Sequence, residues 1–228
     1  MEYTIRGTVM QSVEIKLEQG ESVYTEAGGM AWMTGNIDMQ SGMKGGLMAG
    51  LTRALSGESL FMTDYTCSSG AGFVTFTTET PGKIMPMQLE PGQSIICQRD
   101  AFMVAQAGVA LEMSFQKKLG AGLFGGEGFF LQKITGPGLA CMELSGEIVE
   151  YNLEAGQMLK VDPGHVAMMD PTVSFDIAMV KGIRNIFMSG EGLFLATVTG
   201  PGRVWLQSMP IRNLAHRMIP YLPFKQGD

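Results

Sequence analysis

Residues 126–138 read Gly-Glu-Gly-Phe-Phe-Leu-Gln-Lys-Ile-Thr-Gly-Pro-Gly, and residues 190–202 repeat this stretch as Gly-Glu-Gly-Leu-Phe-Leu-Ala-Thr-Val-Thr-Gly-Pro-Gly. The two copies start 64 residues apart and are identical at nine of thirteen positions. A weaker copy begins at Gly57-Glu58. Self-similarity at a regular spacing is typical of folds in which each unit buries its apolar face against its neighbours. We therefore expect three copies of one structural unit.

A second element, a Leu-Glu-x-Gly turn, recurs at Leu17, Leu89 and Leu153, each time between two short runs that resemble strands. These turns alternate with the Gly-Glu elements at 57, 126 and 190, so the chain begins and ends inside a unit. We predict one all-β domain over residues 1–228, a sandwich or β-helical roll built as a closed ring of three repeats. The N-terminal half-unit is expected to complete the C-terminal one, since ring closure removes exposed sheet edges.

The composition supports a globular β protein and limits the partners. Gly (31) and Pro (10) separate short apolar runs, and hydrophobic residues make up 45% of the 228 residues. The net charge of −6 works against nucleic-acid binding, which needs a basic surface. Three cysteines without CxxC spacing predict free, buried thiols in a reducing cytoplasm. No apolar run is long enough to span a bilayer, although peripheral attachment stays open.

The segment before each Gly-Glu element is apolar and carries basic residues. Equivalent positions would bring the three segments to one face, where they could bind anionic lipid together. A subunit interface and packing on the protein's own core are the alternatives. The residues concerned are Leu47, Leu51, Arg53 and Leu55 in the first segment, Lys117, Lys118, Leu123 and Phe124 in the second, and Lys181, Arg184, Ile186 and Phe187 in the third.

Three carboxylates, Glu58, Glu127 and Glu191, occupy the same place in each repeat. Near the axis they could share a cation, and away from it they would accept hydrogen bonds from turn amides. Three oxygen ligands alone make a poor calcium site, so we expect neither a metal nor a cofactor. The glycines lack the Gly-Lys-Ser/Thr of a phosphate-binding loop and predict turns. The two histidines, His165 and His216, accompany no nucleophile motif, so no catalytic residue is assigned.

Two further segments carry helical patterns. Residues 46–55 place leucines four apart, and residues 211–218 could form a helical turn or two before Pro220.

The Gly-Glu motif, the segment 45–61 and the Leu-Glu-x-Gly turns together resemble the altered-inheritance-of-mitochondria 24 family, over essentially the whole chain. The resemblance implies a fold like that of the tryptophan RNA-binding attenuation protein, a short double-stranded β-helix type with three repeats in a pseudo-three-fold arrangement. It also implies no established enzymatic activity, and the mitochondrial members of the family are linked to inner-membrane organisation. Tryptophan or RNA binding is not expected here, because the chain is acidic and no basic-aromatic pattern recurs in all three repeats.

These observations predict a non-enzymatic scaffold or binding protein that forms homo-oligomers and, through its three loops, is peripheral to a membrane. The alternative is a small-ligand or metal-binding β-helix module or enzyme, which would need a cluster of His and Glu ligands.

Overall fold

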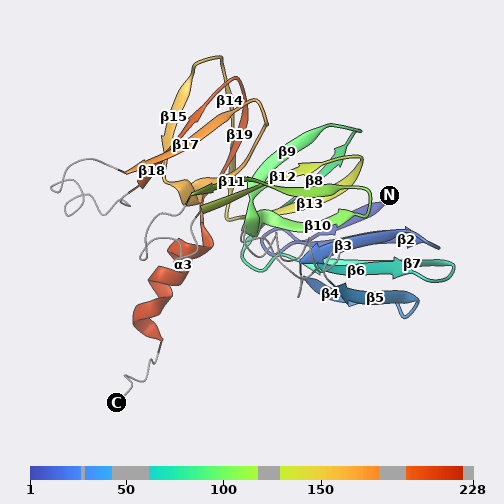
Figure 1. Cartoon of the computed structure of the whole chain (residues 1–228). Coiled ribbons are helices and arrows are strands. Elements are labelled where there is room, and N and C mark those ends of the chain that lie inside the picture. Colours follow the sequence, from blue (N-terminus) through green and yellow to red (C-terminus); the bar gives the residue numbers. More distant parts are fainter. Residues whose placement is uncertain (27–28, 43–61, 118–128, 180–193, 223–228) are drawn as a thin grey trace.

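The computed structural model describes residues 1–26, 29–42, 62–117, 129–179 and 194–222, and these are mostly antiparallel β-strands (Figure 1). An N-terminal strand, β1 (Tyr3–Arg6), precedes three consecutive six-strand units. The first unit contains β2 (Ser12–Glu18), β3 (Ser22–Glu26), β4 (Met30–Met33), β5 (Ile37–Gly42), β6 (Met62–Cys67) and β7 (Ala71–Thr77). The predicted all-β fold is confirmed.

The second and third units have the same order of strands, each with a short 3-10 helix before its third strand. The second contains β8 (Gly82–Leu89), β9 (Ser94–Gln98), η1 (Arg99–Ala101), β10 (Phe102–Gln106), β11 (Ala110–Lys117), β12 (Phe129–Thr135) and β13 (Gly138–Ser145). The third contains β14 (Ile148–Leu153), β15 (Met158–Val161), η3 (Pro163–His165), β16 (Val166–Met169), β17 (Ser174–Met179), β18 (Phe194–Thr199) and β19 (Gly202–Gln207).

The same strand pairings occur in all three units. The first and last strands pair as β2–β7, β8–β13 and β14–β19, and the second and fifth pair as β3–β6, β9–β12 and β15–β18. Each unit therefore forms two groups of three strands, which in the first unit are β2-β7-β4 and β5-β6-β3. Neighbouring units are joined by β3–β10 and β9–β16, which merge four of these groups into two six-stranded sheets. The remaining groups form the four-stranded sheet β1-β2-β7-β4 and the three-stranded sheet β15-β18-β17. A pseudo-three-fold axis through the units stays a prediction.

The expected ring closure is not what the described strands form. β1 pairs with β2, and no described strand of the first unit pairs with one of the third. In the third unit β19 is already flanked by β14 and β16, and the outer edge of β15 has no partner among the described strands of the first unit. The prediction that the N-terminal half-unit completes the C-terminal one is therefore wrong for the described residues.

Apolar and polar side chains alternate along the strands, and the apolar ones form the interior. Val13, Ile15 and Leu17 point inward on β2, for example, while the residues between them are more exposed. Three apolar clusters result, two of them formed by strands of adjacent units. Cys67, Cys97 and Cys141 are free and buried, as predicted. Burial raises the pKa of both Cys97 and Cys141 to about 12, which keeps these thiols protonated.

The repeated Gly-Pro-Gly element links β12 to β13 and β18 to β19. Its first glycine donates its N–H to the preceding Leu-Glu-x-Gly turn, from Gly136 to the Gln93 carbonyl and from Gly200 to the Gln157 carbonyl, both at 3.0 Å. The Gln93 side chain closes its own turn by accepting the Glu90 N–H at 3.0 Å. The two recurrent sequence elements are therefore two sides of one joint, and these glycines are turn residues as predicted.

The chain ends in α3 (Ile211–Met218) and η4 (Ile219–Tyr221), which confirms the predicted C-terminal helix. Figure 1 shows both extending away from the sheets. The predicted helix at 46–55 lies outside the described residues.

Candidate functional site

The sequence-predicted site residues fall almost entirely outside the described residues. Only Lys117 is included, as the last residue of β11. Each of the three apolar and basic segments nevertheless lies between the two strands of an equivalent antiparallel pair, as the repeat pattern requires. These pairs are β5–β6, β11–β12 and β17–β18. The carboxylates Glu58, Glu127 and Glu191 also lie outside the described part of the chain, so their role stays a prediction.

The described residues instead enclose a cavity of about 460 Å³ where the three units meet. The first unit contributes Glu26 from the end of β3, the second contributes η1, and the third contributes Gly164 of η3. Ile211 and Arg212 at the start of α3 line it as well. The cavity is thus a product of the repeat assembly, with each unit supplying the connection between its second and third strands.

Four carboxylates line this cavity, those of Glu26, Glu79, Asp100 and Glu143. Glu143 projects from β13 and accepts the Glu79 backbone N–H at 2.9 Å. Burial raises its pKa to about 7, and the nearby charges of Glu79 and Asp100 push in the same direction. The Glu79 hydrogen bond opposes the shift without cancelling it. Glu143 can therefore change its protonation state near neutral pH.

Glu26 is a second partly buried acid in the cavity. Burial raises its pKa, while a hydrogen bond from Gln132 and the charge of Arg99 act in the opposite direction. One oxygen of Glu26 is buried without a hydrogen-bond partner in the structure, and so is the Gln132 side-chain oxygen. Unsatisfied buried oxygens are costly. Neither of these two oxygens is exposed to the cavity, and Gln132 does not line it.

Two guanidinium groups partly balance these acids. Arg99 lies 3.8 Å from an Asp100 carboxylate oxygen, and its guanidinium stacks over the Phe130 ring at 5.4 Å from the centroid. The Arg212 pKa is lowered by burial. With four carboxylates against two guanidiniums, the cavity has an acidic balance that suits a small cationic ligand better than an anion.

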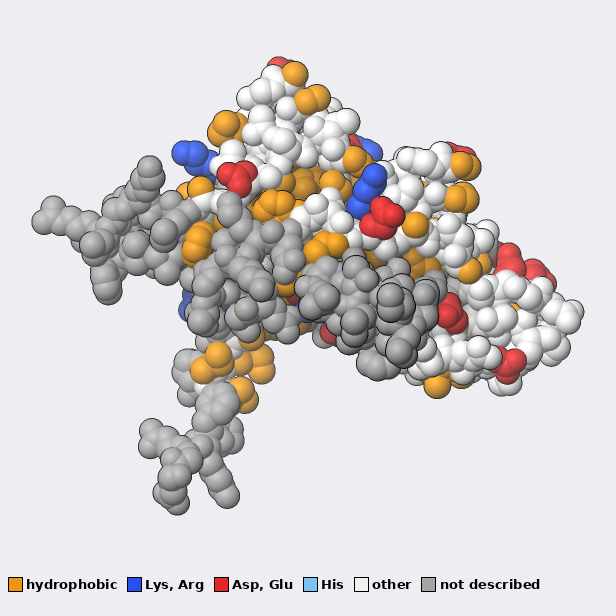
Figure 2. Space-filling model, viewed as in Figure 1, with side chains coloured by type: hydrophobic (Ala, Val, Ile, Leu, Met, Phe, Trp, Pro, Cys, Tyr) orange, Lys and Arg blue, Asp and Glu red, His pale blue; other side chains and the backbone are white. Residues whose placement is uncertain are grey.

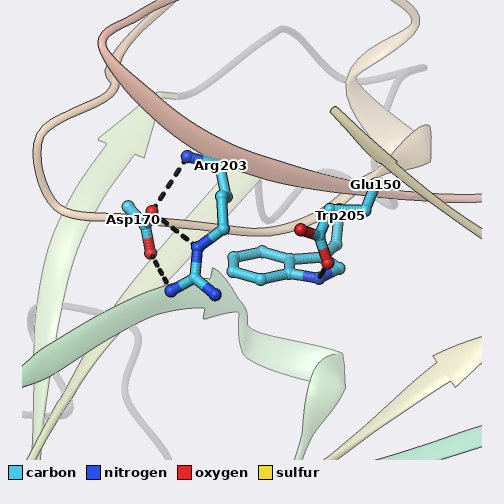
Figure 3. A network of polar contacts seen from close by, with 4 residues as sticks. All are labelled: Glu150, Asp170, Arg203 and Trp205. Atoms are coloured by element: carbon cyan, nitrogen blue, oxygen red, sulfur yellow. Dashed lines mark hydrogen bonds and ion pairs between the residues drawn. The ribbon is translucent and has the colours of Figure 1, made fainter. Parts of the chain in front are cut away.

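A separate polar network surrounds Arg203 on β19 (Figure 3). The guanidinium makes two hydrogen bonds of 3.1 Å to Asp170 and lies 4.8 Å from the centre of the Trp205 ring. The Trp205 indole N–H donates to Glu150 at 2.7 Å. Asp170 also accepts the Arg203 backbone N–H at 2.9 Å.

The other units place a side-chain acceptor at the position equivalent to Asp170. Gln106 accepts the Leu139 N–H at 3.2 Å, and Thr34 accepts the Phe73 N–H at 3.0 Å. The network is therefore read as a structural joint, and none of its four residues lines the cavity.

His165 lies at the end of η3, with Nδ1 2.7 Å from the Gln207 carbonyl oxygen, and does not line the cavity. Within the described ranges, no three His, Cys, Asp or Glu side chains come close enough to hold a metal ion. In the same part of the chain, no helix combines the length and apolar character needed to cross a bilayer.

The C-terminal helix presents an apolar surface. Met218, Ile219, Tyr221 and Leu222 are exposed, and Tyr221 is 86% accessible. Figure 2 shows hydrophobic side chains gathered on the described part of this extension. Arg217 is exposed beside them. The sequence from 209 to 227 contains no Asp or Glu, in a chain with a net charge of −6.

Sequence reasoning missed the cavity because its acids are single residues far apart in the chain. One local signal was present. Glu143 interrupts the otherwise apolar run from Leu139 to Leu144 at a position where a half-buried strand rarely carries a charge.

Comparisons with known proteins cover nearly the whole chain. A family described as Mitochondrial biogenesis AIM24 matches residues 3–209. An uncharacterized protein of Streptococcus pyogenes serotype M6 is 31% identical over 232 residues, which covers 98% of this chain and 92% of the relative. A crystal structure of a Streptococcus pyogenes protein superposes with a TM-score of 0.80 at 27% identity, covering 97% of this chain and 99% of that one. This chain therefore belongs to the Mitochondrial biogenesis AIM24 family.

Proposed function

We propose that this protein is a non-enzymatic scaffold that self-associates and attaches to an anionic membrane surface. The observation that carries the membrane part is the C-terminal extension of α3 and η4, with its exposed Met218, Ile219, Tyr221 and Leu222. A short helix that exposes apolar and aromatic side chains beside a basic residue suits the boundary between headgroups and acyl chains. The predicted lipid-binding role of the three apolar and basic segments is compatible with this attachment.

Charge supports lipid over a polar protein partner. Arg217 is exposed on the extension, and Lys225 adds a further positive charge in the sequence. Each basic residue near an anionic bilayer contributes about 1 kcal/mol of attraction. The acidic body would be held away from such a bilayer, so the extension is the part that suits contact.

We expect the protein to co-sediment with vesicles that contain phosphatidylserine and to bind pure phosphatidylcholine vesicles much more weakly. The double variant Arg217→Glu with Tyr221→Ser should bind the anionic vesicles at least about tenfold more weakly, because it reverses one charge and removes an interfacial ring. The matched control is Arg6→Glu with Tyr3→Ser, which makes the same changes at exposed positions of β1. Equal binding by the two double variants would contradict the proposal.

The cavity favours a second candidate, a module that binds a small organic cation. Its four carboxylates suit an amine, which brings both positive charge and hydrogen-bond donors. Isothermal titration calorimetry with a diamine at pH 8 should show binding by the wild-type protein. Glu143→Gln should weaken it about tenfold, whereas Glu112→Gln on an exposed position of β11 should not. Absence of heat with a series of amines would exclude this candidate.

A further inference from the structure

Two strand edges, on β4 and β15, have no partner among the described strands, although the equivalent edges of the other units are paired. β10 of the second unit pairs with β3 of the first, and β16 of the third pairs with β9 of the second. By the same rule β4 of the first unit should pair with the β15 equivalent of another unit. Among the described strands, however, β4 pairs only with β7, and β15 only with β18.

The burial patterns differ in the same way. All four residues of β16 and the first four of β10 are buried, whereas β4 is half-buried or exposed throughout, and Trp32 is 50% accessible. The central residues of β3 and β9 are likewise buried, while β15 exposes Met158 and Lys160. β4 and β15 therefore carry apolar side chains at positions that are covered wherever the neighbouring unit is present.

The backbone of β4 has the shape that this pairing needs. Its ladder with β7 shifts register between Met30 and Trp32, at the same place as the shifts between Phe102 and Val104 and between Val166 and Met168. A bulge bends a strand and redirects its outer edge. β10 and β16 carry this bulge and still pair with a strand of the preceding unit. The bulge in β4 is therefore compatible with the same kind of pairing.

In this structure β4 and β15 of the same chain do not pair with each other. Figure 1 places β15 and β4 at opposite ends of the molecule, with the two six-stranded sheets between them. An exposed strand edge is a template for a further strand, and a second copy of this chain supplies the strand that is equivalent to β3 and β9.

We propose that copies of this protein join head to tail, with β15 of one copy pairing antiparallel with β4 of the next. The inference deepens the proposed function, because it rests on the self-association stated there and names the surface. The registers within the chain, Ala105↔Tyr24 and Met169↔Ile96, define the register expected between β4 and β15 of two copies. By equivalence Met33 lies opposite Lys160 of the neighbouring copy, and Trp32 lies opposite Val161.

This contact is heterologous, since it joins two different edges. Each copy keeps a free β4 at one end and a free β15 at the other, so assembly continues until the rotation per copy closes a ring or produces a filament.

Disulfide trapping tests the register directly. A mixture of the single variants Met33→Cys and Lys160→Cys, under mild oxidation, should give one covalent dimer on a non-reducing gel, because directly opposite residues meet the spacing of a disulfide. The native cysteines are buried and should not compete. Met33→Cys mixed with Val149→Cys, on the outer strand β14, is the control and should give none. Cross-linking in both mixtures alike, or in neither, would overturn the proposal.

The double variant Met33→Cys with Lys160→Cys distinguishes pairing of β4 and β15 between copies from pairing within one chain. A ladder of covalent multimers or one closed multimer is expected, whereas a cross-linked monomer would show that the ring closes within one chain and would overturn the proposal. Light scattering on the wild-type protein tests self-association itself. A multimer without the Met33–Lys160 cross-link would reject this surface and leave the proposed scaffold standing, while a monomer at all concentrations would reject both.

The variant Trp32→Glu tests the same surface through the dissociation constant of the assembly, without a cross-link. The ring is exposed in the single chain but would be covered in the pair, as Val104 and Met168 are in theirs. We expect the apparent dissociation constant of the assembly to rise about 100-fold, as for loss of a central aromatic contact. Val149→Glu makes a similar change on an exposed site of β14 and should leave the constant unchanged.

Discussion

Replacing Gly136 with alanine is expected to lower the free energy of unfolding by about 3 kcal/mol, the upper range for overpacking a well-packed site. A Cβ at this position would lie 2.6 Å from the Glu90 carbonyl oxygen and 2.7 Å from the Leu89 Cβ. Both belong to the Leu-Glu-x-Gly turn, to which Gly136 also donates its N–H. Backbone on both sides would have to separate, and the joint between two recurrent elements would open.

Two other glycines provide graded controls for this effect. Gly92 lies in the same turn with φ +80° and nothing within 4 Å of an added Cβ, so alanine there should cost about 1 kcal/mol from left-handed strain alone. Gly35 has equally open surroundings without a positive φ, and its alanine variant should stay within about 0.5 kcal/mol of the wild type. Urea unfolding followed by circular dichroism gives all three values. Equal losses at Gly136 and Gly92 would contradict a steric joint.

The local features of this fold could be predicted from the sequence because their causes are local. The Leu-Glu-x-Gly turns need a residue that tolerates positive φ, and Gly20, Gly92 and Gly156 all have φ near +80°. Alternation on β2 follows from one buried face. The buried cysteines follow from their place inside apolar runs.

Long-range features could not be predicted in this way. Repeat order suggested that the N-terminal half-unit would complete the third unit, but β14 pairs with β19 and no described strand of the first unit pairs with the open edge of β15. Which strand takes an edge depends on competition between segments far apart in the chain, and self-similarity does not rank them. The same limit applies to the cavity, whose acids come from β3, η1, β13 and the turn after β7.

The protonation of Glu143 predicts a pH dependence of stability. Its pKa is about 7 in the folded protein and 4.5 as the ordinary value, so between these limits the folded state binds a proton that the unfolded state has released. The free energy of unfolding must therefore fall as the pH rises through this window, and the loss is complete above pH 7. A shift of this size corresponds to ~3 kcal/mol.

Glu143→Gln should remove this dependence, because a neutral amide keeps the acceptor for the Glu79 N–H and has no charge to bury. The variant is expected to be close to the wild type at pH 5 and more stable by up to ~3 kcal/mol at pH 8. Chemical unfolding at a series of pH values measures both curves, with Glu112→Gln as the exposed control. Parallel curves for wild type and Glu143→Gln would show that Glu143 is solvated enough to ionise normally, and the cavity would then be open to water at this wall. Divergence above pH 6 would instead establish a buried acid whose negative charge is costly until a cation shares the cavity.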